Sequence, residues 1–229
     1  MIKLKDIIEG RNMDIKRIAL DMDGVLADFS RQFKEKLSDD DIWAKLITHR
    51  KTISKNKLAK AGYDDESYEV NLRNFVNDAN ALRQKVLASP HIDPFEVMKV
   101  EFKKKFGISP GWTLISWVGE DFWSGMKPME GAEELIAYVK TLGIPLCVLT
   151  AGAGSKAKSG KQKWLAKHGL GDLPFTIVSA GIKKGEEAQV GDLLIDDKEE
   201  NIVVFKQGGG DGIIHINTPQ TIKELKEKL

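Results

Sequence analysis

The sequence predicts an α/β fold, in which a doubly wound, Rossmann-like parallel sheet carries an inserted α-helical cap. Two short apolar segments, at residues 18–20 and 193–195, each end directly in acidic residues. Apolar runs without polar alternation are typical of parallel strands that are buried on both faces. Segments with helical spacing separate the candidate strands, which favours crossover connections. Residues 31–124 show helical patterns without a convincing strand, which predicts a helical insertion after the first strand.

The composition fits a globular protein of 229 residues, a length sufficient for one α/β core and a smaller inserted domain. The net charge of +1 provides no field that would attract a membrane or a long nucleic acid, which disfavours a long nucleic-acid substrate and leaves a small one open. The single cysteine, Cys147, excludes an intrachain disulfide. No segment approaches the roughly 20 apolar residues of a membrane span, and no signal sequence precedes the first strand. A cytoplasmic protein is therefore expected, and a homodimer is left open.

The first candidate strand ends in two acids, Asp21 and Asp23, followed by Gly24. A spacing of two residues places both side chains on one side of an extended chain. The carboxyl ends of the strands are where open α/β sheets bind ligands. Two carboxylates this close repel each other unless a cation lies between them, and hard oxygen ligands suit Mg²⁺. Gly24 allows the backbone to turn sharply beside them.

The predicted domains are an α/β core of residues 1–30 and 125–229 and a helical cap of residues 31–124. Apolar residues recur at helical spacing from Tyr68 to Val86, which indicates a long amphipathic helix. Asp93, followed by a proline, is a typical start for another helix.

The second half of the core repeats the pattern of an apolar strand with a polar end. One strand ends at Thr150, and small residues at 151–154 would let backbone N–H groups approach a phosphate. Another ends at Asp196 and Asp197, so acids recur at the ends of two strands. The remaining core elements are predicted as a helix at 156–169, a strand at 175–179, a helix at 199–207, an edge strand at 212–216 and a helix at 219–229.

These motifs resemble those of a known superfamily. The string Asp-Met-Asp-Gly-Val-Leu-Ala-Asp-Phe, which begins at Asp21, resembles the first motif of the haloacid dehalogenase-like (HAD) phosphotransferases, and within them most of all the 5'(3')-deoxyribonucleotidases. Thr150 resembles the hydroxyl of the second motif. Lys161, three residues before an aromatic residue, resembles the lysine of the third. Asp196 and Asp197 resemble the acid pair of the fourth.

The resemblance implies a Mg²⁺-dependent phosphomonoesterase. Asp21 would attack phosphorus and form an aspartyl-phosphate, and Asp23 would first protonate the leaving alcohol and then deprotonate the hydrolytic water. Thr150 and Lys161 would hold the phosphoryl oxygens. An acid at the position of Asp23 favours a phosphomonoesterase over the dehalogenases and phosphonate hydrolases of the superfamily, which lack it.

The resemblance also implies a metal site and a substrate. Mg²⁺ would be held by Asp21, the backbone carbonyl of Asp23 and Asp196, with Asp197 in a supporting role. Residues 115–132 resemble the end of the deoxyribonucleotidase cap, where an aromatic residue sandwiches the base.

Two tryptophans are candidates for the base contact. Trp117 matches the aromatic position of the family, and Trp123 is a second candidate; the alternative for both is packing in the cap or hinge. The implied substrate is a nucleoside monophosphate, most of all a deoxyribonucleotide.

Two other functions are open at this stage. One is hydrolysis of another small phosphomonoester or of a nucleic-acid 3'-phosphate, although the net charge does not indicate a basic groove. The other is a non-catalytic module that binds a phosphate ligand on the same fold; the presence of all four motifs argues against it. Metal-dependent release of phosphate discriminates an enzyme from a binding module.

Overall fold

The computed structural model describes residues 14–49, 65–89, 93–106, 110–152, 154–179 and 181–229. The chain divides into two compact units, a core of Met1–Phe29 with Gly119–Leu229 and a helical unit of Ser30–Val118. None of the helices among the described residues is long and apolar enough to cross a membrane.

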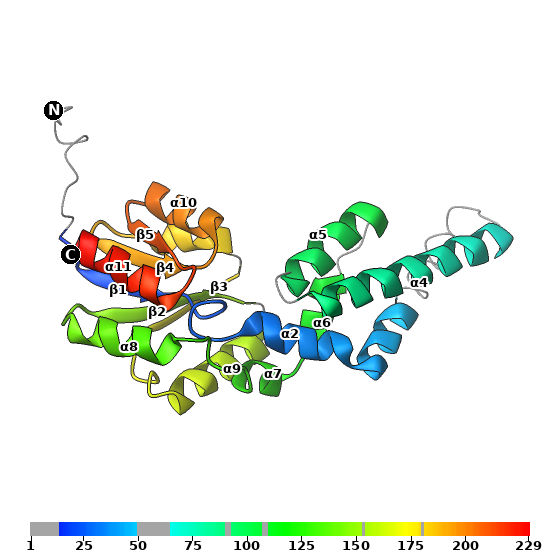
Figure 1. The fold of residues 1–229 in the computed structure, drawn as a ribbon, viewed down its shortest axis with the longest axis horizontal. Helices are drawn as coiled ribbons and strands as arrows, with labels where there is room; N and C mark the ends of the chain where they lie inside the picture. The colour runs from blue at the N-terminus through cyan, green and yellow to red at the C-terminus, as the bar shows by residue number, and fades with distance from the viewer. Residues whose placement is uncertain (1–13, 50–64, 90–92, 107–109, 153, 180) are drawn as a thin grey trace. The chain divides into compact units, whose positions relative to one another are not determined.

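The core contains a parallel sheet of five strands in the order β3-β2-β1-β4-β5 (Figure 1). All four pairings of neighbouring strands are parallel. This confirms the doubly wound parallel sheet that the apolar runs predict. The strands are β1 (Arg17–Leu20), β2 (Leu146–Ala151), β3 (Phe175–Val178), β4 (Asp192–Asp196) and β5 (Asp211–Ile214).

Helices cover both faces of this sheet, with α10 and α8 on opposite sides in Figure 1. One face buries Ala19, Cys147 and Leu194 against Ile202 and Phe205 of α10. Every residue of β4 is buried, as expected for a central parallel strand that is covered on both faces. The core helices are α7 (Glu120–Ser124), α8 (Ala132–Thr141), α9 (Gly154–Lys167), the 3₁₀ helix η1 (Gly181–Glu187), α10 (Glu199–Gln207) and α11 (Thr218–Lys228).

The strand register determines which side chains meet at the carboxyl edge of the sheet. Leu20, the last residue of β1, is aligned with Val148 of β2 and Ile195 of β4. The N–H of Asp21 donates to the carbonyl of Ile195 at 2.9 Å. Asp21 therefore emerges from the sheet beside Asp196, and both lie at the end of the sheet where such folds bind ligands.

The short helix α7 is packed on α9 within the core. A Cβ atom built at Gly160 of α9 would lie 2.5 Å from the carbonyl oxygen of Glu120, so the two helices approach closely. Ser159 and Lys163 of α9 both donate to the Glu120 carboxylate. The division into units accordingly falls after Val118, whereas the sequence predicts a cap that extends to residue 124.

The described part of the second unit is helical. Asp93 accepts hydrogen bonds from the backbone of Phe95 and Glu96, which confirms it as a helix start. Arg83 is buried and donates to the carbonyls of Leu37 and Ser38. The helices of the unit are α2 (Phe29–Ser38), residues 40–49, α4 (Asp65–Ala88), α5 (Pro94–Phe106) and α6 (Pro110–Trp117).

Candidate active site

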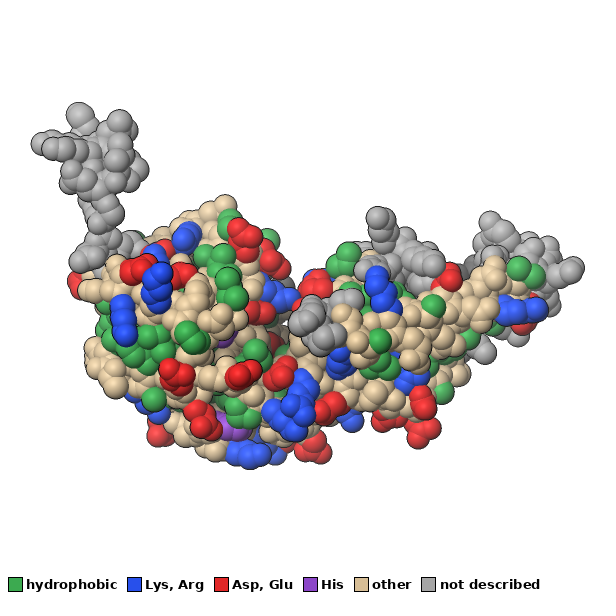
Figure 2. All heavy atoms as spheres, viewed as in Figure 1, with side chains coloured by type: hydrophobic (Ala, Val, Ile, Leu, Met, Phe, Trp, Pro, Cys, Tyr) green, Lys and Arg blue, Asp and Glu red, His purple; other side chains and the backbone are tan. Residues whose placement is uncertain are grey.

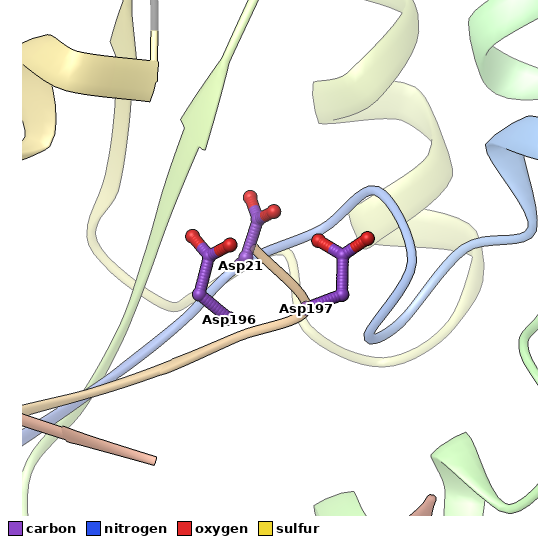
Figure 3. A group of neighbouring side chains, drawn as sticks. All are labelled: Asp21, Asp196 and Asp197. Atoms are coloured by element: carbon purple, nitrogen blue, oxygen red, sulfur yellow. The ribbon is translucent and has the colours of Figure 1, made fainter. Parts of the chain in front are cut away.

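Three carboxylates gather at the carboxyl ends of the two central strands. Asp21 follows β1, Asp196 ends β4 and Asp197 comes next in the chain. Their nearest oxygens all lie within 4.8 Å of one another, and Figure 3 shows the three carboxylate groups pointing to the same side of the strand ends. We call these three residues the acid cluster. Such a group of oxygen ligands could hold a metal ion.

A tight turn at Gly24 brings Asp197 against the loop that follows β1. The carbonyl of Met22 accepts from the N–H groups of both Leu26 and Ala27, which closes the turn. Gly24 has a φ of +84°, which favours glycine, and a Cβ atom there would lie 2.5 Å from Asp197 Oδ2. The glycine predicted to allow this turn is therefore needed both for its backbone conformation and for the space that it leaves to Asp197.

Lys161 links two other predicted site residues, Asp23 and Thr150. Its ammonium group is fully buried and lies 2.7 Å from Asp23 Oδ2, 2.8 Å from Thr150 Oγ1 and 2.8 Å from the carbonyl oxygen of Ala151. Burial raises the pKa of Asp23, the positive charge of Lys161 opposes this rise, and the negative charge of Asp21 adds to it. The structure thus brings Asp23, Thr150 and Lys161 together.

The glycine-containing segment after β2 has one feature that the sequence does not predict. A Cβ atom at Gly152 would lie 2.7 Å from Ile177 Cδ1, so packing against β3 already requires a glycine there. Residue 153 lies outside the described residues. The role of this segment in binding phosphate through backbone N–H groups stays a prediction.

Trp123 packs against Lys161 inside the core. Only 4% of its surface is exposed, and its ring stacks on Phe29 with a centroid distance of 5.8 Å. Phe122 meets the ring edge-on at 5.0 Å, and Lys161 Nζ lies 5.2 Å from its centroid. This enclosure favours the packing alternative for Trp123 over stacking on a nucleobase.

Trp117 ends α6 in the helical unit. Its ring meets His49 edge-on at 5.3 Å, and Lys45 Nζ lies 4.9 Å from the ring centroid. These contacts come from residues 40–49 of the same unit. The contact of Trp117 with a substrate base stays a prediction.

Lys184 is a site residue that none of the sequence motifs indicates. It lies in η1 and is fully buried, with its Nζ 2.5 Å from Asp196 Oδ2 and 2.8 Å from Asp21 Oδ1. A lysine is almost never buried without a charged partner, and Asp21 and Asp196 are the partners of Lys184. The segment that carries Lys184 has no helical or strand periodicity, and no pattern marked it as structured.

Asp196 is held in place by donors on both of its oxygens. Oδ1 accepts from the backbone N–H of Lys198 and from Asn201 Nδ2, each at 2.9 Å. Oδ2 accepts from Lys184 and, at 3.1 Å, from the same amide of Asn201. Asn201 is buried on α10 and was also not predicted as a site residue.

The acid cluster carries more negative charge than its surroundings neutralise. Burial and the charges of Asp21 and Asp196 raise the pKa of Asp197 to about 8. Burial and the charge of Asp21 also raise the pKa of Asp196, against the effect of Lys184. Burial lowers the pKa of Lys184, but the two carboxylates beside it raise that pKa by more. A further cation near the cluster would relieve this repulsion.

Unsatisfied oxygens give a second indication that the acid cluster suits a metal ion. Among the described residues, Asp197 Oδ1 and Asp23 Oδ1 are buried without a hydrogen-bond donor, whereas Asp21 Oδ1 has Lys184 Nζ at 2.8 Å. Buried polar atoms nearly always have such a partner, and an ion is one of the reasons for an exception. The residues present therefore fit a divalent cation at the cluster.

Comparisons with known proteins establish the fold. No protein-family model and no curated protein matches the sequence. A haloacid dehalogenase-like family hydrolase from Xanthomonas campestris matches with a TM-score of 0.51 and 12% identity, over 95% of this chain and 93% of that one. A hydrolase from Streptococcus pneumoniae TIGR4 matches with a TM-score of 0.47 and 12% identity, over 93% of this chain and 100% of that one. An HAD family hydrolase from Deinococcus radiodurans R1, with bound phosphate and sodium, matches with a TM-score of 0.45 and 13% identity, over 93% of this chain and 89% of that one.

The Xanthomonas match carries the conclusion on fold, at an identity too low to transfer an activity. The chain has the fold of the haloacid dehalogenase-like hydrolases. This fold agrees with the fold that the motifs imply, and it does not test the narrower resemblance to the deoxyribonucleotidases.

Proposed function

We propose that the protein is a metal-dependent phosphomonoesterase that works through an aspartyl-phosphate. The observation that carries the proposal is the position of Asp21 and Asp23 at one strand end. Lys161 donates hydrogen bonds to both Asp23 and Thr150 there. A nucleophile, an acid–base group and two phosphate-binding groups are then present on a fold whose motifs resemble those of phosphotransferases.

The reaction would proceed in two balanced steps. In the first, an Asp21 carboxylate oxygen forms a bond to phosphorus while the bond to the ester oxygen breaks, and Asp23 gives its proton to the leaving alkoxide. In the second, a water attacks the aspartyl-phosphate, Asp23 takes a proton from that water, and Asp21 is released with inorganic phosphate. The raised pKa of Asp23 suits a group that must begin the cycle protonated.

Lys161 and Thr150 would neutralise and orient the phosphoryl group. Both side chains are fully buried, so their contacts with the phosphoryl oxygens would be made in a medium of low dielectric constant. Lys161 donates a hydrogen bond to Thr150. Because this bond already orients both side chains, they need to move little when charge develops on the phosphoryl oxygens.

Mg²⁺ is the proposed metal. The carboxylates of Asp21, Asp196 and Asp197 would hold it, together with the backbone carbonyl of Asp23 that the resemblance implies. The bound ion would screen the nucleophilic carboxylate from the phosphate and stabilise charge on the phosphoryl oxygens.

The proposed substrate is a nucleoside monophosphate, with a deoxyribonucleotide favoured by the sequence resemblance. Phosphate release from all deoxy- and ribonucleoside 5'- and 3'-monophosphates, with Mg²⁺ or EDTA, tests the proposal. Asp21→Asn is the matched control, because it removes the nucleophile and keeps the size of the side chain. We expect Mg²⁺-dependent release from a small set of deoxynucleotides and none above background from Asp21→Asn.

The other outcomes of this screen each have a definite reading. Release from sugar phosphates or nucleic-acid 3'-ends alone would retain the phosphomonoesterase and reject the nucleotide substrate. Undiminished turnover by Asp21→Asn would reject the mechanism. No metal-dependent release from any ester would favour a module that binds a phosphate ligand without hydrolysing it.

A further inference from the structure

Lys161 carries its charge into the core on a flexible side chain. On the face of the protein drawn in Figure 2, basic and acidic side chains are intermixed at the surface. The ammonium of Lys161, by contrast, is fully buried and donates to Asp23, Thr150 and the carbonyl of Ala151. A lysine has a four-carbon stem with many rotamers, so the groups packed around it determine how firmly the charge is held.

Trp123 of α7 contacts Lys161 at both ends of the lysine. At the backbone end, a Cβ atom built at the preceding residue, Gly160, would lie 2.6 Å from Trp123 Cβ, so Trp123 rests directly on α9. At the other end, the indole ring lies under the ammonium, with its centroid 5.2 Å from Lys161 Nζ. One side chain of α7 therefore borders both the backbone beside Lys161 and the charge that Lys161 carries.

Two further rings fix the orientation of Trp123. Phe29 stacks on the indole with an angle of 19° between the ring planes, and Phe122 meets it edge-on. Only 4% of the surface of Trp123 is exposed. The indole is therefore a rigid, dry surface for the ammonium.

A polar contact fastens α7 to the segment of α9 that contains Lys161. The Glu120 carboxylate, at the start of α7, accepts from Ser159 and from Lys163, which lie on either side of Lys161 along α9. Their hydrogen bonds lower the pKa of Glu120, so this carboxylate is charged at neutral pH. The helix that carries Trp123 is thus attached to α9 by both polar and apolar contacts.

We propose that Trp123 is a positioning residue whose ring holds the ammonium of Lys161 in place for the phosphoryl group. The inference rests on the proposed function, in which Lys161 neutralises that group. The face of an indole ring is electron-rich and attracts an ammonium, most strongly where water is excluded. Trp123 acts through the lysine and does not itself contact the substrate.

Core packing alone makes a different prediction. If Trp123 only fills space, its loss changes the rate by the same factor whether or not Lys161 is present. If Trp123 positions Lys161, its effect on the rate disappears when the lysine is absent, because no ammonium remains to be held. A double-mutant cycle of the two residues distinguishes these roles.

The test measures Mg²⁺-dependent hydrolysis of p-nitrophenyl phosphate by the full-length wild type, Trp123→Leu, Lys161→Met and the double variant, well below their melting temperatures. We expect Trp123→Leu to lower kcat roughly tenfold, with a smaller change in KM, because the lysine matters most when charge develops in the transition state. In the Lys161→Met background, Trp123→Leu should change kcat by less than about twofold. Trp123→Phe, which keeps an aromatic face, should recover most of the rate.

Trp164→Leu is the matched control. Trp164 is an equally buried tryptophan of α9, and its Nε1 donates to the carbonyl of Met126. Its loss should lower the melting temperature as the loss of Trp123 does. Any effect of Trp164→Leu on kcat should be the same factor with and without Lys161.

Equal factors for Trp123→Leu in the two backgrounds would overturn the positioning role and leave the proposed function intact. Absence of metal-dependent hydrolysis by the wild type would overturn the proposed function and this inference together.

Nuclear magnetic resonance of the wild type keeps the inference falsifiable if Trp123→Leu does not fold. In protein made with isotope-labelled lysine, the ε-CH₂ signal that is missing from Lys161→Met belongs to Lys161. The ring current of Trp123 should shift these protons upfield of the signals of exposed lysines. A Lys161 signal within the range of the exposed lysines would overturn the inference.

Discussion

Lys161 and Asp23 form an ion pair of 2.7 Å between residues that are 138 positions apart in the chain. The pair ties α9 to the loop that follows β1, and the lysine is wholly buried while 27% of the Asp23 side chain is exposed. The buried end of the pair is thus fixed by the fold, and the Asp23 end is partly accessible to solvent. This geometry makes Lys161 the charged partner of Asp23, so a change at one of the two residues alters the electrostatics of the other.

The first prediction concerns this pair. Lys161→Met should lower kcat/KM for phosphate release by a factor of roughly 10²–10³, because a buried charge that stabilises the phosphoryl oxygens is lost. Because Lys161 lowers the pKa of Asp23, the limb of the pH–rate profile that reports Asp23 should move to higher pH. Steady-state kinetics from pH 5 to 9 measure both effects.

Lys163→Met is the matched control for this prediction. Lys163 lies on the same helix, but it is exposed and pairs with Glu120. Its profile should coincide with that of the wild type. A Lys161→Met enzyme with a wild-type rate and profile would exclude Lys161 from the chemistry.

The fold was predictable where a local pattern determines the structure. Apolar runs identified the strands, and the rule that parallel strands carry ligands at their carboxyl ends placed Asp21 and Asp196 together before the register confirmed it. Lys184 could not be found in this way, since it becomes significant only when the fold returns η1 to the end of β1. The sequence also does not distinguish the two roles considered for Trp123, because core packing and base stacking both use an aromatic residue. The stacking of its ring on Phe29 in the structure favours core packing.

The second prediction concerns the turn at Gly24. Gly24→Ala should reduce the free energy of unfolding by about 1–3 kcal/mol, because alanine is strained at a φ of +84° and its Cβ would collide with Asp197. Urea denaturation measures the loss. Gly119→Ala is the control, since a Cβ atom there meets nothing within 4 Å, and it should cost less, about 0.5–1 kcal/mol for the loss of the glycine N-cap of α7. Equal stability of the two variants would refute the steric account.

The third prediction concerns substrate choice and the helical unit. If the base stacks on Trp117, Trp117→Ala should reduce kcat/KM for nucleotides roughly tenfold or more, since stacking on an aromatic face is worth about 1–3 kcal/mol. Hydrolysis of a small aryl phosphate, which does not need this contact, should be unaffected. Trp112→Ala, at an exposed position of the same helix, is the control. A parallel loss for both substrates would indicate damage to the fold instead of a lost base contact.

The last prediction is a pH dependence of stability that arises from His215. This histidine is buried at the end of β5, where its Nδ1 lies 2.8 Å from Thr221 Oγ1. Burial lowers its pKa in the folded protein below the usual value near 6.5. Below pH 6.5 the unfolded chain therefore binds a proton that the folded chain resists, so folding is favoured less as the pH falls. The contribution of His215 to stability should be complete above pH 6.5 and should decline between that pH and its folded pKa.

The acid cluster acts with the opposite sign, so the effect of His215 has to be measured as a difference. The pKa of Asp197, about 8 in the fold, favours the folded state as the pH falls through 8 toward the ordinary carboxyl range. Urea midpoints at pH 7.5 and 5.5 for the wild type and His215→Gln share this term, and it cancels on subtraction. The wild type should lose more stability than His215→Gln over this interval, whereas His49→Gln, at an exposed position, should follow the wild type. Identical losses for all three proteins would show that His215 takes up its proton as readily in the folded state as in the unfolded chain.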